Sequence, residues 1–160
     1  MFKIIDNFLN KEEFKIIEEQ MTNDRFPWYF NKHITTAKKD DDSFYYFSHC
    51  FYENPFKISE FFYSLNCILQ KINFKSITRV KGNLYTSEKR SRKHNVHVDR
   101  DYSHKGCLFY INTNNGFNYF KNEKVKPVAN RVVFFDPSEK HCSSSCTDAQ
   151  RRVTINFNYF

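Results

Sequence analysis

The sequence is poor in residues that break regular structure, with only 3 glycines and 4 prolines among 160 residues. This composition excludes collagen-like and linker-like chains. No stretch approaches the roughly 20 apolar residues of a membrane-spanning helix, so we expect no membrane partner. Internal repeats and low-complexity tails are also missing. A chain of this length without repeats is expected to fold as a single domain, residues 1–160.

Aromatic residues and positive charge are what the sequence has in excess. The 19 Phe, 10 Tyr and 1 Trp make up 19% of the chain, and 40% of all residues are hydrophobic. With 27% charged residues, the composition is typical of a globular protein rather than of a disordered one. Lys and Arg exceed Asp and Glu by 25 to 18, which gives a net charge of +7. That charge suits a small carboxylate, a nucleic acid or an acidic surface without choosing among them.

The number of cysteines is odd, and no secretory signal precedes them. The first residues lack the basic segment followed by an apolar run that such signals contain. An odd count without a signal argues against a disulfide scaffold and favours the reducing cytoplasm. We therefore expect free thiols at Cys50, Cys67, Cys107, Cys142 and Cys146.

Residues 1–75 have the pattern of a helical buttress with an irregular insertion. Asn10 precedes Glu13 by three residues, which is a capping signal for a helix over 11–21. Apolar residues at helical spacing predict a second helix over 59–69. The polar, aromatic-rich segment 31–55 lies between them, and its mixed charge run at 38–42 is expected to be a solvated turn. Of its histidines, His33 and His49, we expect ordinary polar roles.

From Ser76 onward the chain changes to short β-type runs. The predicted strands cover residues 77–85, 96–99, 107–111, 117–120, 131–135 and 152–159. Short strands with turn-like spacers favour a sandwich or a barrel with the helices packed outside it. The predicted fold class is therefore mainly β with flanking helices, and residues 76–160 form its core.

Two of the predicted strands have one polar face each. The polar positions are Arg79, Lys81, Asn83 and Tyr85 in the first, and Arg152, Thr154, Asn156 and Asn158 in the last. Because side chains alternate along a strand, the opposite faces carry apolar residues such as Val80 and Val153. A polar face is either solvated or lines a polar pocket inside the barrel, and alternation alone does not separate the two.

The triplet His97-Val98-Asp99 is the main candidate for a metal-binding motif in the sequence. In a strand, residues two apart point the same way, so His97 and Asp99 would offer two ligands to one divalent metal. His141, just after the strand predicted at 131–135, is the natural third ligand. Two histidines and one carboxylate form a facial triad, which favours Fe(II) and oxygen chemistry over a closed structural zinc site. His94 and His104 flank the triplet but have no carboxylate two residues later, so we do not expect them to bind metal.

Arg152 lies at the start of the polar-faced final strand. A guanidinium group there would hold a carboxylate by a bidentate pair, so the triad and Arg152 together suit a chelating dicarboxylate. Arg151 is the rival, but alternation places it with Val153 and Ile155 on the apolar face. A register error of one residue would exchange the two arginines.

These segments appear in an order and at a spacing that define a family. The residues concerned are 97–99, 108–112, Gly116, 132–135, His141 and 152–157. They resemble the 2-oxoglutarate- and Fe(II)-dependent dioxygenases, most closely the prolyl-hydroxylase-like branch with its small phage and marine microbial members. The likeness covers roughly residues 79–160, and residues 26–30 also look like those small members. Asn130 stands where many relatives carry glycine, but Asn tolerates left-handed backbone angles.

The resemblance implies a double-stranded β-helix, or jelly roll, with helices buttressing one sheet. It implies that iron binds to His97, Asp99 and His141, and that Arg152 pairs with the far carboxylate of 2-oxoglutarate. It also implies cosubstrate contacts from three further residues: Tyr110, which commonly bonds the same carboxylate, with Asn83 and Tyr85.

The function that the resemblance implies is a hydroxylating dioxygenase that uses Fe(II), 2-oxoglutarate and O2 and releases succinate and CO2. The prime substrate is unknown; a protein side chain or a small molecule is favoured, and no motif is specific enough to support a nucleic acid. We expect residues 31–55 and 100–105 to shape the entrance to the site. Two alternatives stay open, a non-catalytic jelly-roll module that binds metal or a carboxylate, and a cupin-like metal enzyme of another reaction type. The expected location is the cytoplasm.

Overall fold

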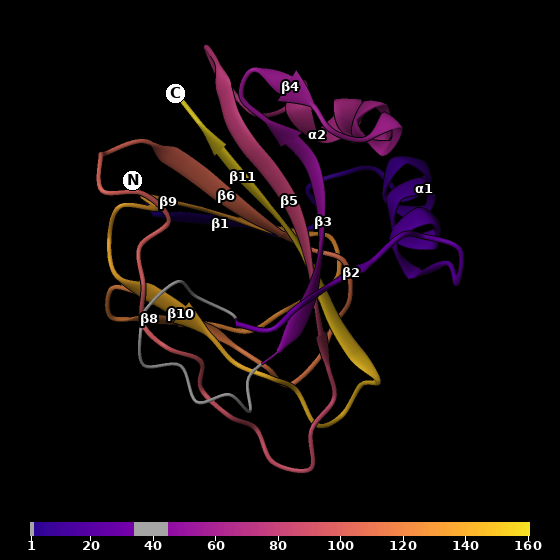
Figure 1. Ribbon diagram of the computed structural model, residues 1–160, viewed down its shortest axis with the longest axis vertical. Coiled ribbons are helices and arrows are strands. Elements are labelled where there is room, and N and C mark those ends of the chain that lie inside the picture. The colour runs from indigo at the N-terminus through magenta and orange to yellow at the C-terminus, as the bar shows by residue number, and fades with distance from the viewer. Residues whose placement is uncertain (1, 34–44) are drawn as a thin grey trace.

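Two antiparallel sheets dominate the computed structural model, which describes residues 2–33 and 45–160. The main sheet has the strand order β1-β9-β6-β11-β5-β3-β2, with β4 paired to β3, and the small sheet has the order β10-β7-β8 (Figure 1). The main-sheet strands are β1 (Lys3–Ile5), β2 (Tyr29–Asn31), β3 (Tyr46–Glu53), β4 (Phe56–Lys57), β5 (Ile77–Thr86), β6 (Lys105–Tyr110), β9 (Arg131–Phe135) and β11 (Arg151–Tyr159). The small sheet contains β7 (Asn118–Phe120), β8 (Glu123–Val125) and β10 (His141–Ser143).

The helices cover one face of the main sheet (Figure 1). They are α1 (Lys11–Thr22), the 3₁₀ helix η1 (Glu60–Leu65) and α2 (Asn66–Leu69). Ile17 and Met21 of α1 share one buried cluster with Val153 and Ile155 of β11. Removal of this apolar surface from water is the main driving force that holds the helices against the sheet.

The opposite face of the main sheet looks toward the small sheet. Leu108 and Val133 from the main sheet pack there against Phe120 and Val125 in a second, smaller cluster. The polar positions of β5 and β11 lie on this same inner side, where Lys81 and Arg152 line a cavity. The polar faces of β5 and β11 therefore line an internal pocket and are not simply solvated, a choice that alternation alone left open.

Helix α1 begins as the sequence predicts. The Asn10 side chain accepts a hydrogen bond from the Glu13 N–H at 2.8 Å, and the Glu13 carboxylate accepts one from the Asn10 N–H at 3.1 Å. This reciprocal pair is the capping box that the spacing indicated. The second predicted helix, 59–69, is a 3₁₀ turn followed by one short α-helical turn, and Ser59 caps it through a hydrogen bond from the Phe61 N–H.

Four long predicted strands are confirmed within two residues at each end, as β5, β6, β9 and β11. The prediction of a strand at 96–99 is wrong, because the only β-bridge of that segment is the isolated one between His97 and His141. The reading of residues 1–75 as helical with an irregular insertion missed four strands, of which β3 pairs with β5. The mixed composition of β3, Tyr-Phe-Ser-His-Cys-Phe-Tyr-Glu, has no clean alternation, so tertiary pairing decides its structure. The charge run 38–42 lies outside the described residues.

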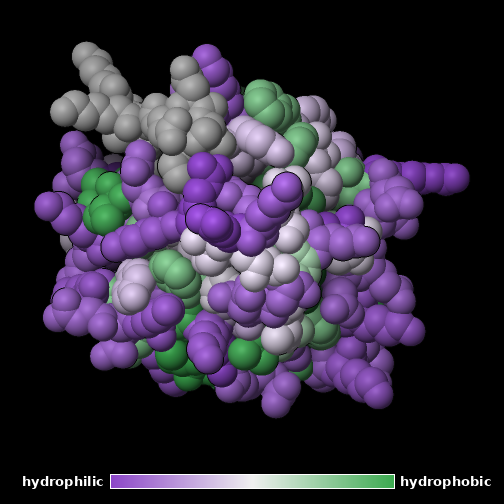
Figure 2. Space-filling model, turned by 90° about the horizontal axis from the view of Figure 1, so that it is seen from below, coloured by the Kyte–Doolittle hydropathy of each residue, from purple (hydrophilic) through white to green (hydrophobic). Residues whose placement is uncertain are grey.

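The connection from β5 to β6 runs along the lower end of the molecule in Figure 1. Figure 2 shows that end from below, covered mainly by hydrophilic side chains, with hydrophobic ones in small separate groups. This face therefore presents polar groups rather than a broad apolar surface.

All five cysteines are free thiols, as predicted from their odd number. None of the helices in the described ranges is long and apolar enough to cross a membrane.

Asn130 occupies the left-handed backbone region, with φ of 61°. Its side chain also joins the N-terminal segment to the sheet, since Asn130 Oδ1 accepts from the Leu9 N–H at 2.9 Å and Asn130 Nδ2 donates to the Leu9 carbonyl at 2.8 Å. The expectation that Asn tolerates this turn is confirmed, and the two hydrogen bonds give Asn an advantage over glycine here.

We expect Asn130→Ala to lower the free energy of unfolding by roughly 2–3 kcal/mol, because it adds backbone strain and removes both hydrogen bonds. Asn130→Gly removes the bonds without the strain and should lose about 1 kcal/mol less. Urea unfolding of the two variants measures the difference. Equal losses would show that the positive φ contributes nothing to the stability of this turn.

Candidate metal centre and carboxylate pocket

Two backbone bridges bring the predicted ligands together. The N–H and carbonyl groups of His97 and His141 exchange hydrogen bonds of 2.9 Å. The Asp99 N–H donates to the Pro137 carbonyl at 2.9 Å, just before β10 begins. The segment around His97 is therefore held beside β10 although it is not a regular strand.

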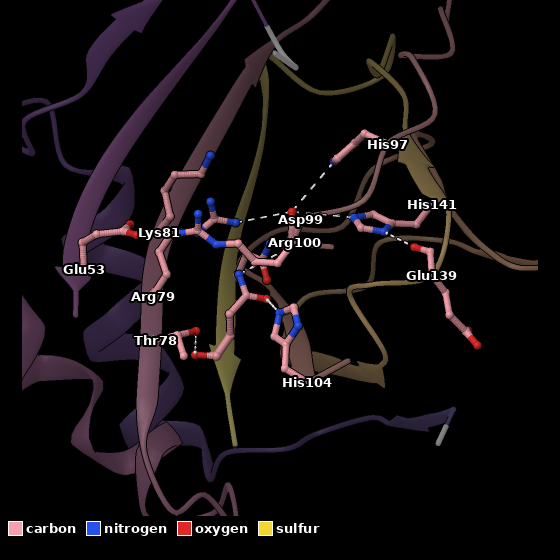
Figure 3. A network of polar contacts seen from close by, with 12 residues as sticks. Glu53, Thr78, Arg79, Lys81, His97, Asp99, Arg100, His104, Glu139 and His141 are labelled. Atoms are coloured by element: carbon pink, nitrogen blue, oxygen red, sulfur yellow. Dashed lines mark hydrogen bonds and ion pairs between the residues drawn. The ribbon is translucent and has the colours of Figure 1, made fainter. Parts of the chain in front are cut away.

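The three side chains converge on one point (Figure 3). One potential ligand atom from each of His97, Asp99 and His141 lies within 4.8 Å of the other two. The Nε2 atoms of His97 and His141 lie 4.0 Å and 3.9 Å from Asp99 Oδ1. The side chains of Asp99 and His141 are each only 8% exposed, whereas about a quarter of the His97 side chain, 26%, is exposed. The triplet thus projects to one side, as the sequence predicts.

Both imidazoles are oriented by backbone carbonyls. The Nδ1–H of His97 donates to the Asn95 carbonyl at 3.1 Å, and that of His141 donates to the Glu139 carbonyl at 2.9 Å. A carbonyl oxygen only accepts, so Nδ1 carries the proton and Nε2 keeps its lone pair. This arrangement fixes the tautomer that a metal ion requires at Nε2.

Asp99 is held as an ionised carboxylate. Its Oδ2 accepts hydrogen bonds from the side-chain amides of Asn156 at 2.9 Å and Asn158 at 3.2 Å, both on β11. Arg79 of β5 lies 3.3 Å from Oδ1. Burial opposes ionisation, but Arg79, His141 and the Asn156 amide outweigh it and lower the pKa of Asp99 below its usual value. Protons therefore compete weakly with a metal ion for this ligand.

Burial lowers the pKa of His97, with a further contribution from the neighbouring His141 ring. A lowered pKa keeps the imidazole neutral at physiological pH, which is the form that binds metal. The donor set is thus two imidazole nitrogens and one carboxylate.

Arg152 is almost completely buried, with 1% of its surface exposed. Its guanidinium carbon lies 5.4 Å from the ring centre of Tyr85 and 5.9 Å from that of Tyr110. One of its terminal N–H groups donates to Asn118 Oδ1, which also accepts from the Tyr110 hydroxyl at 2.9 Å. In the described part of the chain Arg152 has no carboxylate partner, and its buried Nε has no hydrogen bond.

One cavity connects Arg152 with the triad. It is lined by His97, Asp99 and His141, by Arg152, and by several residues of the polar faces, including Asn83 and Tyr85. Arg151 points elsewhere, since its guanidinium donates to the Thr22 carbonyl at the end of α1 at 2.7 Å. Alternation along β11 therefore predicted correctly that Arg152, and not Arg151, faces the cavity.

Sequence reasoning missed the groups that support the centre. It did not assign Arg79, Asn156 and Asn158 to Asp99, although all three lie on the polar faces that it identified. It also missed Asn118, which lies on the short strand β7 and gave no signal of its own. Strand alternation was the signal for the first three, because it had already grouped them with Arg152.

Lys81 is a further cation on the cavity wall. Its ammonium group donates to the Tyr46 hydroxyl at 3.2 Å. Burial lowers the pKa of Lys81, and the nearby Arg79 lowers it further.

Two further histidines, His94 and His49, have structural roles inside the fold. His94 is buried, with Nδ1 2.7 Å from the Ser143 hydroxyl and its ring 5.0 Å from that of Tyr85. Burial lowers the pKa of His94 to about 3. Both nitrogens of His49 have partners, the Pro27 carbonyl and the Ser59 hydroxyl, each at 2.8 Å. Neither histidine belongs to the triad.

The low pKa of His94 makes stability depend on pH. Below its ordinary pKa of 6.5 the unfolded chain takes up a proton that the folded chain refuses until about pH 3. We expect the free energy of unfolding to fall by up to about 1.4 kcal/mol per pH unit in this window from His94 alone. His94→Gln should have a shallower pH dependence than the wild type, which urea unfolding at a series of pH values measures. Parallel curves for wild type and His94→Gln would contradict this assignment.

No protein-family model and no curated protein matches the sequence. Several solved structures match the fold. A prolyl-4-hydroxylase from Pseudomonas putida has a TM-score of 0.64 at 12% identity, with 99% of this chain and 91% of that chain covered. A prolyl hydroxylase from Trichoplax adhaerens, in complex with a hypoxia inducible factor peptide fragment, has a TM-score of 0.65 at 16% identity, with 99% and 83% covered.

HygX from Streptomyces hygroscopicus, with nickel and 2-oxoglutarate bound, has a TM-score of 0.63 at 12% identity, with 99% of this chain and 82% of that chain covered. An oxidoreductase of the 2OG-Fe(II) oxygenase family from Burkholderia pseudomallei has a TM-score of 0.65 at 11% identity, with 99% and 84% covered. The predicted fold is confirmed: the chain folds as the double-stranded β-helix of the 2-oxoglutarate and Fe(II) oxygenases.

Proposed function

We propose that this protein is a 2-oxoglutarate- and Fe(II)-dependent dioxygenase that hydroxylates its substrate and releases succinate and CO2. The observation that carries the proposal is Arg152, a buried cation without a carboxylate partner, in the same cavity as His97, Asp99 and His141. A buried guanidinium group without a counter-ion is costly, because little of its lost hydration is replaced. An anionic cosubstrate that binds in the cavity would supply the missing counter-ion.

The donor set of the triad fits Fe(II). Two imidazole nitrogens with fixed tautomers and one ionised carboxylate are the ligands of non-haem iron oxygenases. His97 and His141 would hold the ion through Nε2 and Asp99 through Oδ1, while Asn156 and Asn158 hold Oδ2. These amides orient the carboxylate, and its other oxygen, Oδ1, faces the ion and Arg79.

The pocket also fits a dicarboxylate. Arg152 would bind the far carboxylate through its unsatisfied Nε–H and a neighbouring N–H, with Tyr110 beside it through Asn118. Asn83 and Tyr85 would complete the cosubstrate wall. When bound, Fe(II) and 2-oxoglutarate together supply the O2-dependent oxidation, and the protein contributes orientation and the exclusion of water.

A peptidyl side chain is the prime substrate that we favour. The similar prolyl hydroxylase from Trichoplax adhaerens is in complex with a peptide fragment, which supports this substrate class by analogy of fold. We further propose that residues 1–160 form one catalytic domain that works in the cytoplasm, where five free thiols are stable.

Anaerobic titration of the protein with Fe(II) and then 2-oxoglutarate tests the cosubstrate site. We expect the weak visible charge-transfer band of a metal-chelated keto acid in the wild type. Arg152→Ala should weaken 2-oxoglutarate binding by roughly tenfold or more, because the far carboxylate loses its charged partner. The adjacent variant Arg151→Ala is the matched control and should bind like the wild type, since Arg151 contacts Thr22 outside the cavity.

A protein that binds iron but gives no band would contradict the proposal. It would favour the non-catalytic jelly-roll module or a cupin-like enzyme of another reaction type. Equal losses in Arg151→Ala and Arg152→Ala would instead contradict the assignment of Arg152.

Replacement of a metal ligand should abolish both metal binding and turnover. Because loss of an outer-sphere partner alone costs about 10- to 100-fold in metal affinity, we expect His97→Ala or Asp99→Ala to weaken Mn(II) binding by roughly 100-fold or more. Isothermal titration with Mn(II), an inert substitute for Fe(II), measures this directly, and Arg151→Ala, outside the cavity, is the control.

A further inference from the structure

A second depression, which we call the outer hollow, lies directly outside the metal centre. Its walls include Phe30, Tyr46, Lys81, Val98, Asp99 and Arg100. Lys81, His97 and Asp99 line both the outer hollow and the inner cavity, so the two spaces meet at the triad. A substrate group that reacts at the metal would therefore have the rest of its molecule in the outer hollow.

The outer hollow is lined by more cations than anions. Lys32, Arg79, Lys81 and Arg100 contribute to its walls, and Asp99 is its one carboxylate in the described part of the chain. Arg79 pairs with Asp99 at 3.3 Å, and Arg100 pairs with Glu53 at 2.6 Å. Lys81 differs from both, because it pairs with no carboxylate among the described residues.

Lys81 lies in the wall that the outer hollow and the inner cavity share. It projects from β5 on the same side as Arg79, toward the side where Asp99 lies (Figure 3). Its ammonium group uses one hydrogen to bond the Tyr46 hydroxyl at 3.2 Å, and the Tyr46 ring is stacked on Tyr85 with their centres 5.7 Å apart. Two ammonium hydrogens are left for a ligand, and a bound anion would offset the cost of burying this charge.

The outer hollow also reaches the edge of the main sheet. Strand β2 ends the sheet order, so in the described part of the chain its outer side has no strand partner. Its residues Tyr29 and Phe30 are each 62% exposed. An extended peptide can align with such an edge, and exposed aromatic side chains provide contact area for it.

The charge distribution favours a peptide over a nucleic acid. Binding of a nucleic acid depends on several Lys or Arg side chains that each neutralise a phosphate along the backbone. Here Arg79 and Arg100 already have carboxylate partners, and Lys81 is the cation of the outer hollow that also lines the inner cavity. Lys81 is therefore the site for one anionic group close to the metal.

Resting on the proposed function, we propose that the prime substrate is an extended peptide with an Asp or Glu side chain close to the residue that reacts, and that Lys81 binds this carboxylate. Lys81 is thus a specificity-determining residue of the outer hollow.

The test uses the full chain loaded with Mn(II) and 2-oxoglutarate, and short fluorescein-labelled peptides with a central proline. The peptides form matched sets in which the neighbouring positions carry Asp or Glu, the isosteric Asn or Gln, or Lys. Fluorescence anisotropy should show acidic peptides binding about fivefold or more tighter than their amide counterparts. Lys81→Met should abolish this preference and Lys81→Arg should keep it. Lys15→Met, on the exposed side of α1, should behave as the wild type.

The proposal is overturned if no peptide binds, if acidic peptides have no advantage, or if the advantage survives Lys81→Met. It is also overturned if a labelled single-stranded oligothymidylate binds more tightly than every acidic peptide and depends on Lys81, which would assign the charge to a nucleic acid. Melting temperatures of the variants confirm that they are folded. The anaerobic band with 2-oxoglutarate is measured separately: its presence with no acid preference overturns only the role of Lys81, whereas its absence in the wild type overturns the proposed function.

Discussion

The alternation of side chains along β11 is the constraint on which the rest of the structure depends. This strand lies between β5 and β6 and pairs with both of them, so its register is fixed from two sides. One set of its side chains, beginning with Val153, packs into the core beneath the helices. The other set brings Arg152 and Asn156 into the cavity and Asn158 to the Asp99 carboxylate. A slip of one residue would bury the polar set under the helices and expose the metal centre to apolar groups.

The inner side of the sheet concentrates buried charge that the fold alone does not balance. Asp99 is surrounded by Arg79 and two imidazoles, whereas Arg152 and Lys81 have no carboxylate of their own in the described residues. Such an arrangement lowers stability in isolation, and natural proteins accept it mainly at functional sites. Under the proposed function, this excess of positive charge is a preorganised receptor for two anions, one at the cosubstrate end and one at the substrate end.

The sequence carried the information for the centre of the fold better than for its edges. The triad, Arg152 and the four central strands were predictable because each follows from a period of two or from a short motif. The strand β3 was not, since its pairing with β5 depends on a partner distant in sequence rather than on its own pattern. The segment around His97 was predicted as a strand, yet its backbone makes only isolated contacts, with His141 and Pro137, and the motif alone could not reveal that. Asn118 accepts hydrogen bonds from both Tyr110 and Arg152, and this link depends on the tertiary fold, so no sequence pattern predicts it.

A crystal structure of the protein prepared anaerobically with Mn(II) and 2-oxoglutarate tests the central claim most directly. We expect one metal ion bound by His97, Asp99 and His141, the keto acid chelated to it, and the far carboxylate paired with Arg152. A metal ion outside the triad, or a keto acid that leaves Arg152 without a carboxylate, would contradict it.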